Sequence, residues 1–110
     1  MRFWSDESIM PVQLPIDQTR IAAFCRKWKI REFSLFGSVL REDFRPESDI
    51  DVLVSLEPDA PWSLWEWVDM KEELSGLFGR EVDLLEKDGL RNPFRRYAIL
   101  TSKQVIYAAD

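Results

Sequence analysis

The chain has 110 residues, 45% of them hydrophobic and 32% charged, a composition typical of one folded domain with a single core. Its formal net charge of −5 argues against a general nucleic-acid-binding protein, because contacts to phosphates need clustered Lys and Arg. Histidine is absent, which excludes a Ser/His/Asp triad and imidazole zinc sites and leaves carboxylates as the candidate charged catalytic groups.

The compartment is predicted from two further features. Cys25 is the only cysteine, so no internal disulfide can form and a reducing environment is expected. The first residues, MRFWSDESIM, contain no apolar run long enough for a signal peptide or a membrane span. We therefore expect a cytoplasmic protein without direct membrane or nucleic-acid contacts.

The first predicted element is a helix over residues 16–28, with Asp17 as its N-cap and Ile16 packing onto Ile21. Its apolar stripe is formed by Ile21, Phe24, Cys25 and Trp28. Because Cys25 belongs to this stripe, we interpret it as an inert core thiol rather than a nucleophile. Residues 1–15 are assigned to an N-terminal arm and residues 16–110 to the domain.

Two strands and a second helix follow. The strands are predicted over residues 32–38 and 49–55, and residues 58–61, PDAP, break the chain. The helix is predicted over residues 64–78, with Gly79 in a C-cap position. Its apolar stripe is predicted to consist of Leu64, Trp67, Val68, Leu74 and Leu77.

The last elements complete an interleaved pattern of strands and helices. A strand is expected over residues 80–86, a helix that opens with Pro93 over residues 93–100, and a closing strand over residues 104–108. This order predicts an α+β (mixed α/β) domain, with helices packed on a small mixed sheet.

The segment FGSVLREDFRPESDID places two aspartates, Asp49 and Asp51, on the second predicted strand. Side chains alternate along a strand, so both carboxylates are expected on one face, about 6.5 Å apart. Like charges at this spacing favour a cation between them, and hard oxygen ligands suit Mg²⁺, which takes substrate phosphates as further ligands. The pair therefore predicts a site for a metal and a polyphosphate.

Gly37 and Ser38 precede this pair, at the end of the first strand. A glycine there lets the backbone approach an anion closely, and the following turn directs free N–H groups towards it. If the 80–86 strand lies beside the 49–55 strand, Asp83 adds a third carboxylate, and the set suits two-metal phosphoryl or nucleotidyl transfer. The alternative is that RPESD is an ordinary turn and that Asp83 is simply an exposed acidic residue on a strand.

These residues resemble the minimal nucleotidyltransferases of the polymerase beta superfamily: FGS, ten residues, DID, a helix, and a strand with VDLL. The resemblance covers residues 32–107 and implies a palm-like mixed sheet flanked by helices. It further implies ATP as the nucleotide donor, Mg²⁺ held by Asp49 and Asp51, and Asp83 as a third carboxylate that ligates metal and helps deprotonate the acceptor.

The resemblance also implies nucleotide-binding residues and a partner. Gly37 and Ser38 match the residues that hold the triphosphate. Arg41 could reach it as well, although it is flanked by Leu40 and Glu42 rather than by the small residues of many relatives, and a surface ion pair is an equal alternative. LREDFRPESDID is especially similar to the antitoxin members, which are paired with a HEPN ribonuclease toxin in a hetero-oligomer.

Three functions follow from this reading. The first is an antitoxin nucleotidyltransferase that transfers AMP from ATP to a tyrosine of its HEPN toxin. The second is a catalytically silent antitoxin that neutralises its partner by occlusion. The third is a small-molecule nucleotidyltransferase, against which the short chain argues, because such relatives add a domain to hold their acceptor.

A candidate docking surface lies on the 64–78 helix. Trp62 and Trp65 are predicted opposite its apolar stripe, where polar residues are expected. An exposed tryptophan is a frequent interface anchor, so Trp65 is predicted to contact the partner close to the active site. The alternative is that both tryptophans pack under the 56–61 loop or the N-terminal arm.

Overall fold

A computed structural model describes residues 16–40, 45 and 48–109, so the predicted N-terminal arm lies outside the described residues. The elements in chain order are α1 (Gln18–Lys27), β1 (Ile30–Phe36), the 3-10 turn η2 (Gly37–Leu40), β2 (Ile50–Leu56), α2 (Leu64–Phe78), β3 (Val82–Glu86), the 3-10 turn η3 (Lys87–Gly89), α3 (Pro93–Ser102) and β4 (Gln104–Ala108). The predicted mixed α/β class and the order of its elements are confirmed.

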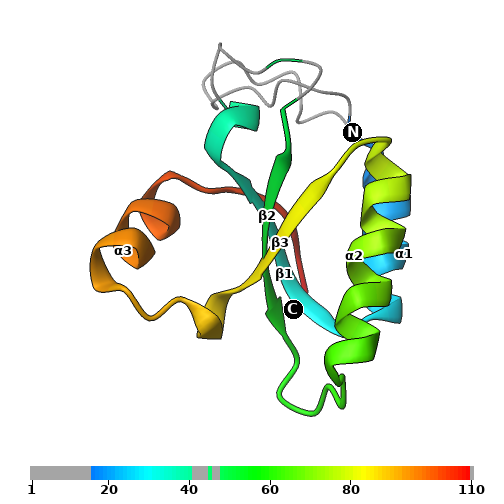
Figure 1. The fold of residues 1–110 in the computed structure, drawn as a ribbon. Coiled ribbons are helices and arrows are strands. Elements are labelled where there is room, and N and C mark those ends of the chain that lie inside the picture. The colour runs from blue at the N-terminus through cyan, green and yellow to red at the C-terminus, as the bar shows by residue number, and fades with distance from the viewer. Residues whose placement is uncertain (1–15, 41–44, 46–47, 110) are drawn as a thin grey trace.

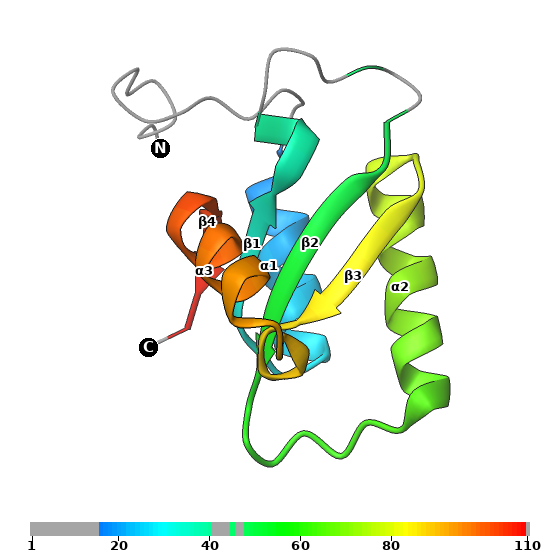
Figure 2. The same ribbon diagram turned by 60° about the vertical axis from the view of Figure 1, so that its left-hand side comes forward.

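The four strands form one mixed sheet in the order β3-β2-β1-β4, seen edge-on in Figure 1 and with all four strands labelled in Figure 2. β1 is antiparallel to both β2 and β4, whereas β2 and β3 are parallel. A parallel pair needs a long crossover connection, and α2 supplies it. The starts of β2 and β3 therefore lie at the same end of the sheet as the end of β1.

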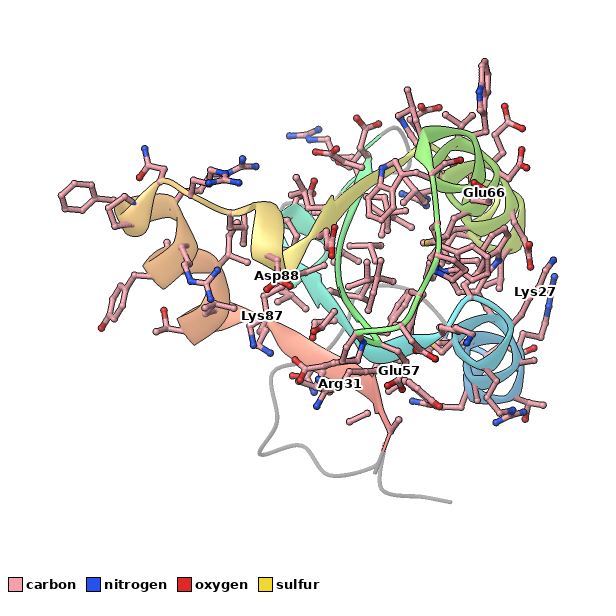
Figure 3. All side chains as sticks on the ribbon, turned by 90° about the horizontal axis from the view of Figure 1, so that it is seen from below. Lys27, Arg31, Glu57, Glu66, Lys87 and Asp88 are labelled. Atoms are coloured by element: carbon pink, nitrogen blue, oxygen red, sulfur yellow. The ribbon has the colours of Figure 1, made fainter. Side chains whose placement is uncertain are left out.

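The helices cover opposite faces of this sheet, with α1 and α2 on one face and α3 on the other (Figures 1 and 2). The main core lies under α1 and α2 and includes Phe33, Leu35, Val52 and Met70. A smaller cluster lies on the α3 face and consists of Phe36, Leu53, Leu90 and Ile99. Figure 3 shows this division from the end of the sheet, with Lys27 on the α1 side and Lys87 on the α3 side.

The first helix starts two residues later than predicted and ends one residue earlier. Its predicted cap is confirmed, because the Asp17 side chain accepts a hydrogen bond of 3.1 Å from the Arg20 backbone N–H. Cys25 is fully buried, and this burial raises the pKa of its thiol to about 12, with the charge of Arg26 opposing the shift. The prediction of an unreactive core thiol agrees with both observations.

The bounds of α2 are as predicted, and Gly79 ends the helix with a φ of 72°. The predicted apolar stripe is partly wrong, because Leu64 is 72% and Val68 is 40% exposed, whereas Met70 and Leu74 are fully buried. At 100° per residue, the apolar side chains of α2 spread over more than half of its circumference. The pattern alone therefore did not identify the side that faces the sheet.

The two tryptophans of the predicted docking surface have different environments. Trp62 packs edge-on against Trp28, with ring centroids 5.2 Å apart, and its Nε1–H donates a 2.7 Å hydrogen bond to the Trp28 carbonyl. The prediction of an exposed face is therefore wrong for Trp62. It holds for Trp65, whose side chain is 77% exposed.

An ion pair between Lys103 and Glu32 connects the end of α3 to β1. Hydrogen bonding from Lys103 lowers the pKa of Glu32, and partial burial opposes that shift. The positive charges of Lys103 and Lys87 and a hydrogen bond from Ser34 lower the pKa further.

None of the helices in the described part of the chain is long and apolar enough to cross a lipid bilayer.

We expect the variant Glu32→Gln to be less stable than the wild type at pH 7, with a difference that shrinks in acid. A carboxyl group whose pKa is lowered by folding stabilises the protein above its ordinary value of 4.5, and this contribution is lost as the pH falls through the lower folded pKa. Urea unfolding at a series of pH values between 7 and 3 measures the effect, with the exposed Glu72→Gln as control. A destabilisation that does not change with pH would contradict the role of the ion pair.

Candidate functional site

Three strand ends meet at one end of the sheet and bring distant parts of the sequence together (Figures 1 and 2). Asp51 pairs with Phe36 of β1 on one side and with Asp83 of β3 on the other. The condition set for Asp83, that its strand lies beside the strand of Asp51, is therefore met. Asp51 and Asp83 occupy the same register position on adjacent strands.

The two carboxylates lie on the face of the sheet opposite the main core. The neighbours of Asp51, Ile50 and Val52, are buried beneath α1 and α2, so alternation directs Asp51 to the α3 face. The same pattern along β3 exposes Asp83 on that face. Strands in a sheet lie about 4.8 Å apart, so the two like charges are close neighbours, and a shared cation would relieve their repulsion.

Asp49 lies immediately before the strand that carries Asp51. It precedes β2, which begins at Ile50, one residue later than predicted, and its side chain is exposed. The shared face of Asp49 and Asp51 stays a prediction. Across the described ranges, no three acidic residues are gathered as ready ligands of a metal ion. The sheet places Asp51 and Asp83 at adjacent positions, and metal binding by Asp49, Asp51 and Asp83 stays a prediction.

Gly37 is held directly against the carboxylate of Asp51. Its φ is 78°, a left-handed conformation that favours glycine. A Cβ built at this position would overlap Asp51 Oδ2 and would lie 3.2 Å from Asp51 Cγ. The sequence interpretation explained this glycine by close approach to a phosphate, whereas the structure gives it a second function, which is to make room for the Asp51 side chain.

Ser38 follows in the 3-10 turn, where it is half-buried. The next two residues, Val39 and Leu40, are inserted into the main core, with exposed fractions of 0% and 7%. The turn is therefore anchored to the hydrophobic interior. Arg41, the other residue predicted to contact the triphosphate, lies outside the described residues.

Sequence reasoning missed one residue near this site, Arg80. It lies three positions before Asp83, and its guanidinium donates hydrogen bonds to the carbonyl oxygens of Arg45 and Ser48, in the segment before Asp49. A basic residue shortly before an acidic strand position was the only signal in the sequence. Such a signal is too common to single out a residue.

Comparison with known proteins identifies a family. The nucleotidyltransferase domain family matches residues 20–106. A candidate protein adenylyltransferase of Methanocaldococcus jannaschii is 36% identical over 73 residues, which are 66% of this chain and 72% of that protein. The protein adenylyltransferase MntA of Thermococcus cleftensis is 32% identical over 81 residues, 74% of this chain and 77% of that protein.

Solved structures share the fold. A candidate minimal nucleotidyltransferase has a TM-score of 0.64 and 31% identity, covering 79% of this chain and 86% of that one. A toxin-antitoxin complex with AMP-PNP has a TM-score of 0.68 at 20% identity, covering 86% and 76%. A complex of tri-AMPylated Shewanella oneidensis HEPN toxin with MNT antitoxin has a TM-score of 0.59 at 20% identity, covering 84% and 70%. These neighbours confirm the predicted fold, and together with the relatives they confirm the predicted resemblance.

The contact between Gly37 and Asp51 is tested by comparing two alanine variants. Gly37 and Gly79 have nearly the same positive φ, 78° and 72°, but a Cβ at Gly79 would meet no atom within 4 Å. Gly79→Ala is expected to cost about 1 kcal/mol through backbone strain alone. We expect Gly37→Ala to cost a further 1–3 kcal/mol or so, because Asp51 must move.

Urea unfolding of both variants measures this difference, and Asp51→Ala provides the matched background. If the side chains collide, Gly37→Ala should cost much less in the Asp51→Ala protein than in the wild type. Equal costs in the two backgrounds would show that Gly37 is required for its backbone conformation only.

Proposed function

This chain belongs to the nucleotidyltransferase domain family, and we propose on that premise that it is an antitoxin that transfers AMP from ATP to a tyrosine of a HEPN-type ribonuclease toxin. The observation that carries the proposal is the pairing of Asp51 with Asp83 beside Gly37. Two carboxylates on a shared face, next to a turn that contains a glycine, suit a metal-bound nucleotide better than a structural role, because neither carboxylate contributes to a core.

The carboxylates fit Mg²⁺, which in nucleotide-dependent enzymes binds one or two carboxylates and completes its coordination with substrate phosphates and water. Asp51 and Asp83 would hold the ion, with the exposed Asp49 as a further candidate ligand. When bound, the ion would neutralise charge on the triphosphate. The turn at Gly37 and Ser38 would bind the phosphate oxygens through backbone N–H groups and the Ser38 hydroxyl.

The transfer exchanges one bond to phosphorus for another. The tyrosine oxygen attacks the α-phosphorus, the bond from that phosphorus to the bridging oxygen of pyrophosphate breaks, and the pyrophosphate leaves with the electron pair. The phenolic proton passes to the carboxylate of Asp83 and then to water. The products are AMP-tyrosine and pyrophosphate, and no oxidant or reductant is required.

The relatives support the choice of acceptor and partner. Both relatives are described as protein adenylyltransferases, MntA outright and the Methanocaldococcus jannaschii protein as a candidate, and one solved neighbour is a complex with a HEPN toxin that carries three AMP groups. The described domain has a single main core and a smaller satellite cluster, both used to build the sheet and its helices. We expect the acceptor tyrosine to belong to the toxin, which would dock beside the acidic pair.

We expect Asp51→Asn and Asp83→Asn each to abolish AMP transfer while the fold is retained. The substitution removes a ligand charge with almost no change in volume, and relief of like-charge repulsion should leave the melting temperature equal or higher. The purified protein is incubated with the HEPN-type toxin, ATP and Mg²⁺, and the toxin is weighed by mass spectrometry. Asp69→Asn, on the exposed side of α2, is the control.

A gain of one or more AMP residues in the wild-type reaction, lost in the site variants but not in the control, supports the proposed function. Neutralisation of the toxin without any gain in mass would instead support an antitoxin that acts by occlusion. Full transfer by Asp51→Asn would contradict the assignment of the site.

The proposed docking role of Trp65 stays a prediction, but its location near the active site is wrong. α2 begins at the end of the molecule opposite the starts of β2 and β3, and Figure 3 shows this end, with Glu66 labelled beside it. Any contact that Trp65 makes with the toxin is therefore remote from Asp51 and Asp83. A partner that reaches both surfaces must extend along the length of the domain.

For Trp65→Ala we expect toxin binding to weaken at least tenfold, about 1.4 kcal/mol, with an unchanged melting temperature. The side chain is 77% exposed, so the fold does not depend on it. Calorimetric titration with the toxin measures the affinity, and Trp62→Phe, which removes a hydrogen bond inside the domain, is the contrast. Normal toxin binding by Trp65→Ala would place the interface elsewhere.

A further inference from the structure

Arg80 lies in the three-residue connection between the end of α2 and the start of β3. Its backbone N–H donates to the Ser75 carbonyl at 3.2 Å, which fixes the residue to the last turn of α2. Its side chain extends across to the segment before β2, where Nη1 lies 3.0 Å from the Arg45 carbonyl oxygen and 3.3 Å from that of Ser48. The guanidinium therefore ties two parts of the chain that are more than thirty residues apart.

Two further hydrogen bonds join Arg45 and Ser48, the two residues that the Arg80 side chain contacts. The Ser48 N–H donates to the Arg45 carbonyl at 3.0 Å, and the Arg45 N–H donates to the Ser48 hydroxyl at 3.1 Å. The Arg45 carbonyl thus accepts from both the Ser48 N–H and the guanidinium. Charged donors form stronger hydrogen bonds than neutral ones, so the two bonds from Arg80 help to hold Arg45 and Ser48 in place.

The residues on both sides of Asp49 are hydrogen-bonded to the connection between α2 and β3. On one side the Ser48 carbonyl is held by Arg80, and on the other the Ile50 N–H donates to the Glu81 carbonyl at 3.0 Å. Asp49 lies outside the strand, so sheet pairing does not place it. The two attachments to residues 80 and 81 fix its backbone relative to β3, the strand that carries Asp83.

We propose that Arg80 is a positioning residue that fixes the backbone of Asp49 relative to Asp83, so that the exposed Asp49 carboxylate is held ready for the metal-bound nucleotide. The inference rests on the proposed function and extends it to a residue that touches none of the reacting atoms. An arginine suits this position because its planar group keeps its charge and offers several donors in fixed directions. A lysine would present one compact ammonium and could hold the two carbonyls less well.

The test uses Arg80→Met and Arg80→Lys, with Arg31→Met as a control. Arg31 is an exposed arginine on β1, at the end of the sheet away from Gly37 (Figure 3). Amide hydrogen exchange, measured without any ligand, should rise at Ser48 and Ile50 by about tenfold or more in Arg80→Met. The increase should be smaller in Arg80→Lys and absent in Arg31→Met. Unchanged exchange at both amides in Arg80→Met would overturn the proposal.

The second measurement connects the hydrogen bonds of Arg80 to nucleotide binding. The dissociation constant for ATP in the presence of Mg²⁺ is measured by calorimetry, well below the melting temperature. We expect Arg80→Met to weaken binding about tenfold in the wild-type background and to have little further effect in the Asp49→Asn background. Equal effects in both backgrounds would show that Arg80 does not act through Asp49 and would overturn the proposal.

Failure of the proposed function would look different. Wild-type protein that binds no ATP with Mg²⁺ would contradict the nucleotide site itself, and with it any role of Arg80 in binding. The exchange measurement would still decide whether Arg80 fixes the Asp49 backbone. A lower melting temperature with unchanged exchange and affinity would show that Arg80 is a structural residue only, and would overturn the proposal.

Discussion

The close approach of the Asp51 carboxylate to the Cα of Gly37 is the constraint on which the site depends. It requires that β1 end at Phe36, that the chain turn through a left-handed residue, and that no side chain occupy the position beside Asp51. Val39 and Leu40, which follow in the same 3-10 turn, pack into the main core and hold the turn against it. One contact therefore couples the end of β1, the start of β2 and the position of a candidate metal ligand.

The fold was largely predictable because local signals agreed with each other. Asp17 marks the start of α1 as an N-cap, and Gly79 marks the end of α2 as a left-handed residue. The apolar residues Ile50, Val52 and Val54 face the main core from alternate positions of β2, as predicted. The observed end of β1 and start of β3 each differ from the prediction by two residues, because turn residues occupy the predicted strand ends. The side of α2 that faces the sheet could not be predicted, since its apolar residues surround more than half of the helix.

The site was predictable where chemistry and alternation coincide, and not where it depends on contacts between distant segments. The DID sequence indicated a carboxylate site, but only the parallel pairing of β2 with β3 shows that Asp83 is the direct neighbour of Asp51. The position of Asp49 outside the strand and the hydrogen bonds of Arg80 have no local signature. Both depend on contacts between two loops that are far apart in the sequence. The periodicity of a single sequence does not indicate such contacts.

The division of the sheet into two faces has a consequence for how such chains diverge. Ile50, Val52, Val82 and Leu84 bury their side chains beneath α1 and α2, while the residues between them carry the candidate chemistry on the opposite face. Substitutions that repack the interior can therefore accumulate, as long as volume and pattern are kept, without moving the carboxylates. Selection on the acceptor can in the same way reshape the outer surface without weakening the interior. If the interior and the outer surface change independently in this way, proteins can keep the architecture at low sequence identity. The solved neighbours, at about 20% identity, fit that expectation.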